Sequence, residues 1–153
     1  MKKIPNITRV IIDIALHFII TMVVVYYVYS MSRNIAYAIA IFCGGILLDL
    51  DHFIDYYIYF RNKFRIGDFL GASYLKSRKV YLLMHSWELV FMILCFSFWF
   101  NSRILFFFCL AAILHLAMDN LQRKNLFFYF ISYRIFKKFD AAAILTEYKG
   151  TYY

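Results

Sequence analysis

Acidic and histidine residues gather at the end of one long apolar stretch of this chain. The segment GGILLDLDHFIDYY, residues 44–57, places Asp49, Asp51, His52 and Asp55 directly after an apolar run. On a helix, residues three or four positions apart share a face, so Asp49 aligns with His52 and Asp51 with Asp55. Carboxylate oxygens and imidazole nitrogens at this spacing are typical ligands of zinc, manganese and iron. The segment therefore predicts part of a metal centre.

Three further pairs of a histidine with an acidic residue occur along the chain. Their spacing is i,i+4 or i,i+3, which places both members of each pair on one helical face. The pairs are Asp13 with His17, His85 with Glu88, and His115 with Asp119. Each of the four histidines in the sequence thus comes with a neighbouring carboxylate.

Long apolar segments must position these residues. A helix crosses a bilayer with about 20 mostly apolar residues, and 64% of this chain is hydrophobic, well above the share in soluble domains. Four segments are long enough to predict membrane-spanning helices: 10–29, 35–57, 80–100 and 104–121. The first resembles a signal peptide but lacks a small-residue cleavage site, so we interpret it as a retained anchor. Gly44 and Gly45 are expected to permit close helix packing. The predicted fold is all-α, an integral membrane four-helix bundle over residues 1–121.

Lys and Arg residues divide unevenly between the two sides of this predicted bundle. Of the 17, only Arg33 and Arg103 fall in the short loops on one side. Excess positive charge marks the cytoplasmic side, so we expect both termini in the cytoplasm, at a bacterial-type inner (plasma) membrane. Residues 122–153 are then a cytoplasmic tail, whose aromatic and basic segment 125–139 predicts an interfacial helix. Contact with anionic membrane lipids explains the net charge of +8 better than a nucleic-acid partner does.

The predicted topology places all four histidines in one layer, roughly 8–12 Å from the cytoplasmic surface at about 1.5 Å per helical residue. A single intramembrane histidine usually serves to hydrogen-bond one helix to another and not to bind metal. For the whole set, a closed network of ion pairs is the alternative to a metal site. The predicted spans contain no Lys or Arg to neutralise the carboxylates, however. Unpaired anions in a bilayer are prohibitively costly. We therefore predict one or two divalent metal ions, Zn, Mn or Fe, as the counter-charge.

Each candidate residue receives a predicted role at this centre. The expected metal ligands are His17, Asp49, His52, His85, His115 and Asp119, with Asp51 as a further ligand or bridging carboxylate. Glu88 or Asp55 is the expected general base, or a residue that orients a ligand, although Glu88 could instead cap a helix or pair with a basic residue. Four residues of the long cytoplasmic loop could bind a phosphate, although each alone is better explained as a positive-inside residue: Arg61, Arg65, Arg78 and Lys79.

Four short motifs follow one another between residues 17 and 119. They are His17 in the first apolar segment, LLDLDH at 47–52, MHSWE at 84–88 and HLAMD at 115–119. Their order resembles that of the YdjM-like family of membrane-bound metal-dependent hydrolases, with its LPDxDH, THS and HxxxD motifs. Leu48 stands where the family has proline, and Met84 where it has threonine, so the chain looks like a divergent member. The resemblance implies a hydrolase and leaves its substrate open.

A metal centre open to the cytoplasmic leaflet predicts hydrolysis of an amphiphilic phosphate ester. A bound metal ion lowers the pKa of a coordinated water and polarises a phosphoryl oxygen. We therefore expect a metal-dependent hydrolase, with a phospholipid or polyprenyl phosphate as its substrate. Two alternatives stay open: a metal-binding or metal-transporting protein without catalysis, and a structural adaptor whose polar layer fixes helix register. Against transport, no comparable polar set continues to the other side of the predicted spans.

Overall fold

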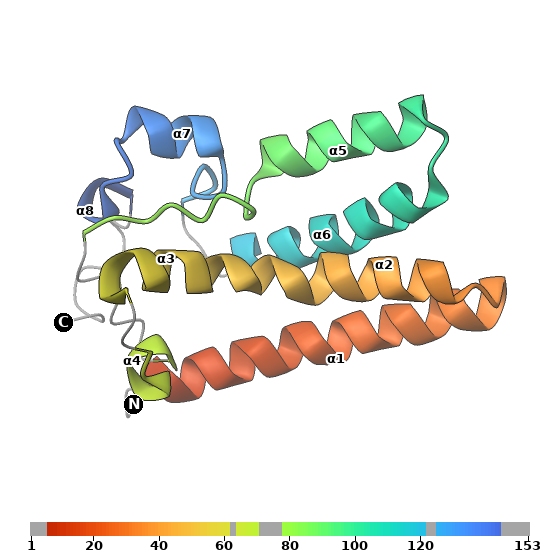
Figure 1. Cartoon of the computed structure of the whole chain (residues 1–153), viewed down its shortest axis with the longest axis horizontal. Coiled ribbons are helices and arrows are strands. Elements are labelled where there is room, and N and C mark those ends of the chain that lie inside the picture. Colours follow the sequence, from red (N-terminus) through yellow and green to blue (C-terminus); the bar gives the residue numbers. More distant parts are fainter. Residues whose placement is uncertain (1–5, 62–63, 71–77, 122–124, 145–153) are drawn as a thin grey trace.

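Helices form most of the computed structural model, which describes residues 6–61, 64–70, 78–121 and 125–144 (Figure 1). Helix α1 (Asn6–Ser32) runs the length of the molecule and is followed by the antiparallel helix α2 (Ile35–Ile46). The short 3-10 helix η1 (Leu47–Leu50) joins α2 to α3 (Asp51–Phe60). Figure 1 shows α2 and α3 continuing one another as a single rod beside α1. Residues 49–55 lie at and just after the junction between the two helices of this rod.

The second half of the chain packs against this rod. Helix α5 (Trp87–Trp99) lies antiparallel to α6 (Arg103–Leu121), and α6 packs against both α2 and α5. Three short helices lie at the end where α1 begins and α6 ends: α4 (Ile66–Leu70), α7 (Ile131–Phe136) and α8 (Ala141–Ile144). The short turns from α1 to α2 and from α5 to α6 lie at the opposite end.

Three helical stretches are long and apolar enough to cross a membrane: Val10–Ser32, Ile35–Phe60 and Arg103–Leu121. The fourth helix, expected over residues 80–100, forms only over Trp87–Trp99, which is 13 residues. At about 1.5 Å per residue it covers roughly 20 Å, less than the ~30 Å hydrocarbon core of a bilayer. The second half of the chain therefore contains one long apolar helix and one shorter one.

Residues 80–86 stay outside α5 because other parts of the protein supply their hydrogen-bond partners. The N–H groups of Val80 and Trp87 each donate to a backbone carbonyl of the segment 125–144, both at 3.0 Å. The N–H groups of Tyr81, Met84 and His85 donate to carboxylates of α3. Backbone away from water can leave the helical state only where the protein offers such partners. These long-range bonds are not visible in the hydropathy pattern, which is why the predicted helix was too long.

The C-terminal segment packs on the core and does not form the single interfacial helix expected over 125–139. It consists of a turn at residues 126–129 followed by the short helices α7 and α8. Phe128 and Tyr129 join the buried core, and Arg134 is fully buried. The prediction was wrong because several of these aromatic and basic side chains face the protein. Residues 122–124 and 145–153 of the predicted tail lie outside the described residues.

Gly44 and Gly45 bring α2 close to its neighbours, which confirms their predicted role. A Cβ atom at Gly44 would fall against the backbone carbonyl of Phe108 in α6, and one at Gly45 against the side chain of Thr21 in α1. Close helix contact at small residues is how apolar helices pack in a membrane, where lipid is as apolar as the side chains.

A Gly44→Ala substitution is expected to lower the free energy of unfolding by about 1–3 kcal/mol, the usual cost of overpacking. The added Cβ would meet the backbone carbonyl of Phe108, so α6 must shift to make room for it. The measurement is unfolding of the protein in detergent, followed by circular dichroism. Gly67→Ala is the matched control, because an added Cβ there meets nothing within 4 Å. Equal stability of both variants would contradict the packing argument.

Candidate metal centre

All four histidines of the chain lie together in the structure. His17 comes from α1, His52 from α3, His115 from α6 and His85 from the irregular segment before α5. The ring centroids of His17 and His115 are 4.2 Å apart, those of His85 and His115 5.3 Å, and those of His52 and His85 5.1 Å. The single layer expected from the predicted topology is thus a continuous group of four imidazoles.

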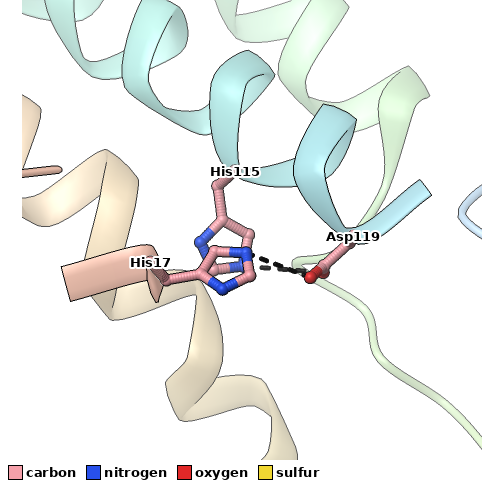
Figure 2. Close-up of side chains that lie close together, drawn as sticks. All are labelled: His17, His115 and Asp119. Atoms are coloured by element: carbon pink, nitrogen blue, oxygen red, sulfur yellow. Dashed lines mark ion pairs between the residues drawn. The ribbon is translucent and has the colours of Figure 1, made fainter. Parts of the chain in front are cut away.

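Two aspartates complete this group. Asp49 Oδ1 lies 3.6 Å from His85 Nε2 and 3.5 Å from His115 Nε2. Asp119 Oδ2 lies 3.7 and 3.6 Å from the same two nitrogens. The other oxygen of Asp119, Oδ1, lies 3.1 Å from His17 Nε2 (Figure 2). We call these six residues the His/Asp cluster: His17, Asp49, His52, His85, His115 and Asp119.

Three of the imidazoles are oriented with Nε2 toward the cluster and Nδ1 toward an oxygen behind it. The oxygens are the carbonyl of Gly45 for His115 (2.8 Å), the carbonyl of Asp13 for His17 (2.9 Å) and the carboxylate of Asp51 for His85 (3.4 Å). Carbonyl and carboxylate oxygens can only accept, so each Nδ1 carries the hydrogen. In a neutral ring the Nε2 lone pair then points into the cluster. Metal-binding histidines are held in this way, with the second nitrogen donating to an oxygen.

Four atoms at the middle of the cluster lie at distances typical of atoms that share a metal ion. Apart from the separation between the two carboxylate oxygens, the distances among Asp49 Oδ1, His85 Nε2, His115 Nε2 and Asp119 Oδ2 lie between 3.3 and 3.7 Å. Ligand atoms around a tetrahedral zinc ion with bonds of about 2.0–2.2 Å are about 3.3–3.6 Å apart. Two nitrogen lone pairs and two carboxylates this close repel one another unless a metal ion or a proton lies between them. The buried His/Asp cluster could therefore hold a metal ion.

The cluster also divides into two groups of three. Within each group the ligand atoms lie within 4.8 Å of one another: His17, His115 and Asp119 in one, and Asp49, His52 and His85 in the other. Asp119 presents Oδ1 to His17 and Oδ2 to His85 and His115. A carboxylate with its two oxygens facing two sets of nitrogens is suited to bridging two ions. The geometry thus fits one ion at the middle or two ions that share Asp119.

The cluster is open at one edge. The side chains of His17, His85 and His115 are at most 3% exposed, whereas that of Asp49 is 35% exposed. Asp49 belongs to η1, the short 3-10 segment that interrupts the α2–α3 rod. A small molecule or a headgroup can reach the cluster only where a ligand is accessible, so the Asp49 edge is the candidate entrance.

Asp51 and Asp55 lie behind the cluster and face the backbone of the segment 80–86. Asp51 Oδ2 accepts from the N–H groups of Met84 at 2.6 Å and His85 at 3.1 Å, and its contact with the His85 ring is at Nδ1. Asp55 Oδ2 accepts from the N–H of Tyr81 at 3.0 Å. The structure therefore places Asp51, predicted as a ligand or bridge, behind the ring of the candidate ligand His85.

Glu88, predicted as a general base, is hydrogen-bonded by Ser86 and by the start of α7. Its carboxylate accepts from the hydroxyl of Ser86 at 2.7 Å, the N–H of Ile131 at 2.9 Å, and the N–H and hydroxyl of Ser132 at 3.0 and 2.7 Å. His85 precedes α5, so Glu88 and His85 do not share a helical face as the i,i+3 spacing predicted. Glu88 thus holds two elements together and is not part of the His/Asp cluster.

The basic residues proposed for phosphate binding are all exposed: Arg61, Arg65, Arg78 and Lys79. Lys79 donates from Nζ to the carbonyl of Lys138 at 2.7 Å. Among the described contacts, none links these four side chains to the His/Asp cluster. They remain candidates for a headgroup at the surface and are not part of the metal centre.

Arg134 is the functional candidate that sequence reasoning missed. It is fully buried and donates to the carbonyls of Leu82 at 2.6 Å and His85 at 2.8 Å. Its sequence setting, a basic residue among aromatics in a segment too short to span a membrane, equally fits a surface helix. Only the packing of α7 on the core distinguishes the two.

Comparison with known proteins adds no family to this geometry. No protein-family model, curated protein or solved structure matches the chain. The likeness to the YdjM-like hydrolases therefore depends on its ordered motifs alone. The function of the chain must therefore be argued from its own residues, above all from the His/Asp cluster.

Proposed function

We propose that this protein is a membrane-embedded metal-dependent hydrolase, a divergent relative of the YdjM-like family. One observation carries the proposal: three imidazoles with their Nδ1 atoms hydrogen-bonded to oxygens direct Nε2 toward two carboxylates, in a buried site. An imidazole and carboxylate set of this kind suits Zn, Mn or Fe. In this proposal α5 completes a four-helix bundle, and both termini are cytoplasmic.

Hydrolysis is the chemistry that such a centre supports best. A metal ion bound there would supply an acidified water and polarise a phosphoryl oxygen. The chain's own residues would do the rest. His17, His85 and His115 hold the centre from buried positions, and Asp49 lies at its accessible edge. We assign to Asp49 the orientation of the attacking water, since its carboxylate is a candidate ligand and is partly exposed.

An amphiphilic phosphate ester is the proposed substrate class. Asp119 lies in the last turn of α6, and Figure 1 shows that α6 ends on the side of the molecule where α4, α7 and α8 gather, which we assign to the cytoplasm. A phospholipid or polyprenyl phosphate could bring its headgroup to the Asp49 edge while its chains stay in the bilayer. Arg61, Arg65, Arg78 and Lys79 are the basic residues available to its phosphate at the surface.

The second candidate function is metal binding without catalysis. The near-complete burial of three histidines favours it, because structural metal sites are closed and catalytic ones keep an open position. A closed site predicts that bound metal stabilises the protein and that no phosphate is released from any lipid. A site with an open coordination position predicts that bound metal stabilises the protein and that phosphate is released from a lipid substrate.

The proposal is tested on the full chain purified in detergent and placed in lipid vesicles. We expect zinc, manganese or iron by elemental analysis, and metal-dependent phosphate release from vesicles that contain phosphatidic acid or a polyprenyl phosphate. An Asp49→Asn variant should keep most of its metal and lose most of the turnover, because the buried ligands remain. Metal flux across the vesicles without phosphate release would favour transport. A protein that folds equally well without metal would favour the adaptor.

A further inference from the structure

The segment that carries His85 is held by buried charged groups through both its N–H groups and its carbonyls. Carboxylates from α3 accept from its N–H groups: Asp55 from Tyr81, and Asp51 from Met84 and His85. These two aspartates are one helical turn apart and face the same stretch of backbone. They fix the segment with respect to α3.

The guanidinium group of Arg134 fixes the carbonyls. Nη1 donates to Leu82 and Nη2 to His85, at 2.6 and 2.8 Å. A guanidinium presents its donors in a rigid planar fork, so two bonds from one group set the distance between two carbonyls. The carbonyl of His85 and the imidazole that enters the cluster belong to the same residue. Moving Arg134 therefore moves a candidate ligand.

Arg134 is itself held in place by contacts that do not involve the cluster. The carboxylate of Glu88 accepts from the N–H groups of Ile131 and Ser132, the first residues of α7. Arg134 follows within the same short helix, and its side chain is fully buried. Glu88 thus fixes α7 to α5, and α7 presents Arg134 to the segment 80–86.

Burial of a guanidinium needs compensation, and the aspartates supply it. Removal from water lowers the pKa of Arg134, while the charges of Asp51 and Glu88 act in the opposite direction. An apolar side chain would fill the same space without the free-energy cost of burying a charge. The buried charge therefore indicates a specific role: Arg134 is attracted to the carboxylates that bind the N–H groups of the same segment.

We propose that Arg134 is a positioning residue for the metal centre, which fixes the backbone of His85 so that its imidazole stays directed at the His/Asp cluster. The inference rests on the proposed function, because it assumes that the cluster binds metal. Arg134 touches neither metal nor substrate in this account. Its effect reaches the centre through residues 82–85.

The experiment compares Arg134→Met with Arg134→Lys, and uses Arg103→Met as a matched control. Arg103 is an exposed arginine at the start of α6, at the opposite end of the helix from His115 and Asp119. The readouts on the full chain in detergent are the dissociation constant for Zn²⁺, the visible spectrum of the Co²⁺ form, and amide hydrogen exchange of residues 80–86 without metal. The spectrum reports ligand geometry, which a general loss of stability leaves unchanged in the folded fraction.

Arg134→Met is expected to weaken Zn²⁺ binding by about 10–100-fold, the range for groups that orient a metal ligand. The Co²⁺ spectrum should shift, and exchange should rise in residues 80–86 but not in α1 and α2. Arg134→Lys keeps the charge without the fork, so it should recover part of the affinity, and Arg103→Met should behave as wild type. Wild-type affinity and spectrum in Arg134→Met would overturn the inference, as would an equal rise in exchange throughout the protein.

The result also separates this inference from the proposed function. If the wild type binds no metal, the proposed function fails, and the exchange of residues 80–86 alone decides whether Arg134 holds the segment. Unchanged exchange would then reject the role of Arg134 as well. If Arg134→Met does not fold, Arg134→Lys is compared with Arg103→Met instead. A smaller loss of Zn²⁺ affinity and a smaller rise in exchange in Arg134→Lys would support the inference, and wild-type values would overturn it.

Discussion

Replacement of His115 by alanine is expected to weaken metal binding by more than about 100-fold, beyond the effect of losing a group that only orients a ligand. His115 Nε2 lies 3.3 Å from His85 Nε2 and 3.5–3.6 Å from oxygens of Asp49 and Asp119. It therefore contacts members of both ligand groups, and no other histidine is available to replace it, because all four are already in the cluster. Competition with a chelator measures the change.

A neighbouring residue gives the control for this substitution. Leu114→Ala removes a 37%-exposed apolar side chain one position away on the same helix and takes away no ligand. It should bind metal as the wild type does. A His115→Ala variant with wild-type affinity would show that the imidazoles are assembled for another purpose, such as hydrogen bonding between helices.

Replacement of Asp51 by alanine is expected to lower both stability and metal affinity. Asp51 is fully buried and accepts from two backbone N–H groups, which would lose their partner. Each such buried donor costs about 1–3 kcal/mol, so the free energy of unfolding should fall by about 2–6 kcal/mol. His85 would also lose the oxygen behind its Nδ1. Denaturant unfolding in detergent and metal titration measure the two effects.

Two further variants separate these effects. Asp51→Asn keeps one oxygen that can accept from the backbone but loses the charge, so it should retain more stability than Asp51→Ala. Asp68→Ala on α4, outside the cluster and the segment 80–86, should change neither quantity. If Asp51→Ala were as stable as the wild type, the hydrogen bonds to Met84 and His85 would not be what holds the segment.

Much of the cluster could be predicted from the sequence because helical periodicity and depth are local properties. His17, His115 and Asp119 lie on regular helices, and their positions follow from residue spacing alone. The alignment of Asp51 with Asp55 also holds, since both face the segment 80–86. The spacing could not show that the face shared by Asp51 and Asp55 meets the backbone of residues 80–86 and not the candidate metal site.

The errors all concern contacts between residues far apart in the chain. An apolar stretch with one histidine is predicted as a helix, whereas hydrogen bonds with Asp51, Asp55, Arg134 and the C-terminal backbone explain why residues 80–86 are not helical. Likewise, the sequence makes Glu88 look like a base beside His85, whereas in the structure its carboxylate accepts hydrogen bonds from Ile131 and Ser132 at the start of α7. Periodicity says which residues share a face, and tertiary packing decides what that face meets.

The most direct test of the account is the X-ray absorption spectrum of the purified protein loaded with one equivalent of Zn²⁺. The account predicts nitrogen and oxygen ligands at about 2.0–2.2 Å, with scattering from imidazole rings, and the loss of that pattern in His115→Ala. A spectrum of fully hydrated zinc, or one dominated by sulfur from the cysteines, would contradict the assignment of the His/Asp cluster as a metal centre.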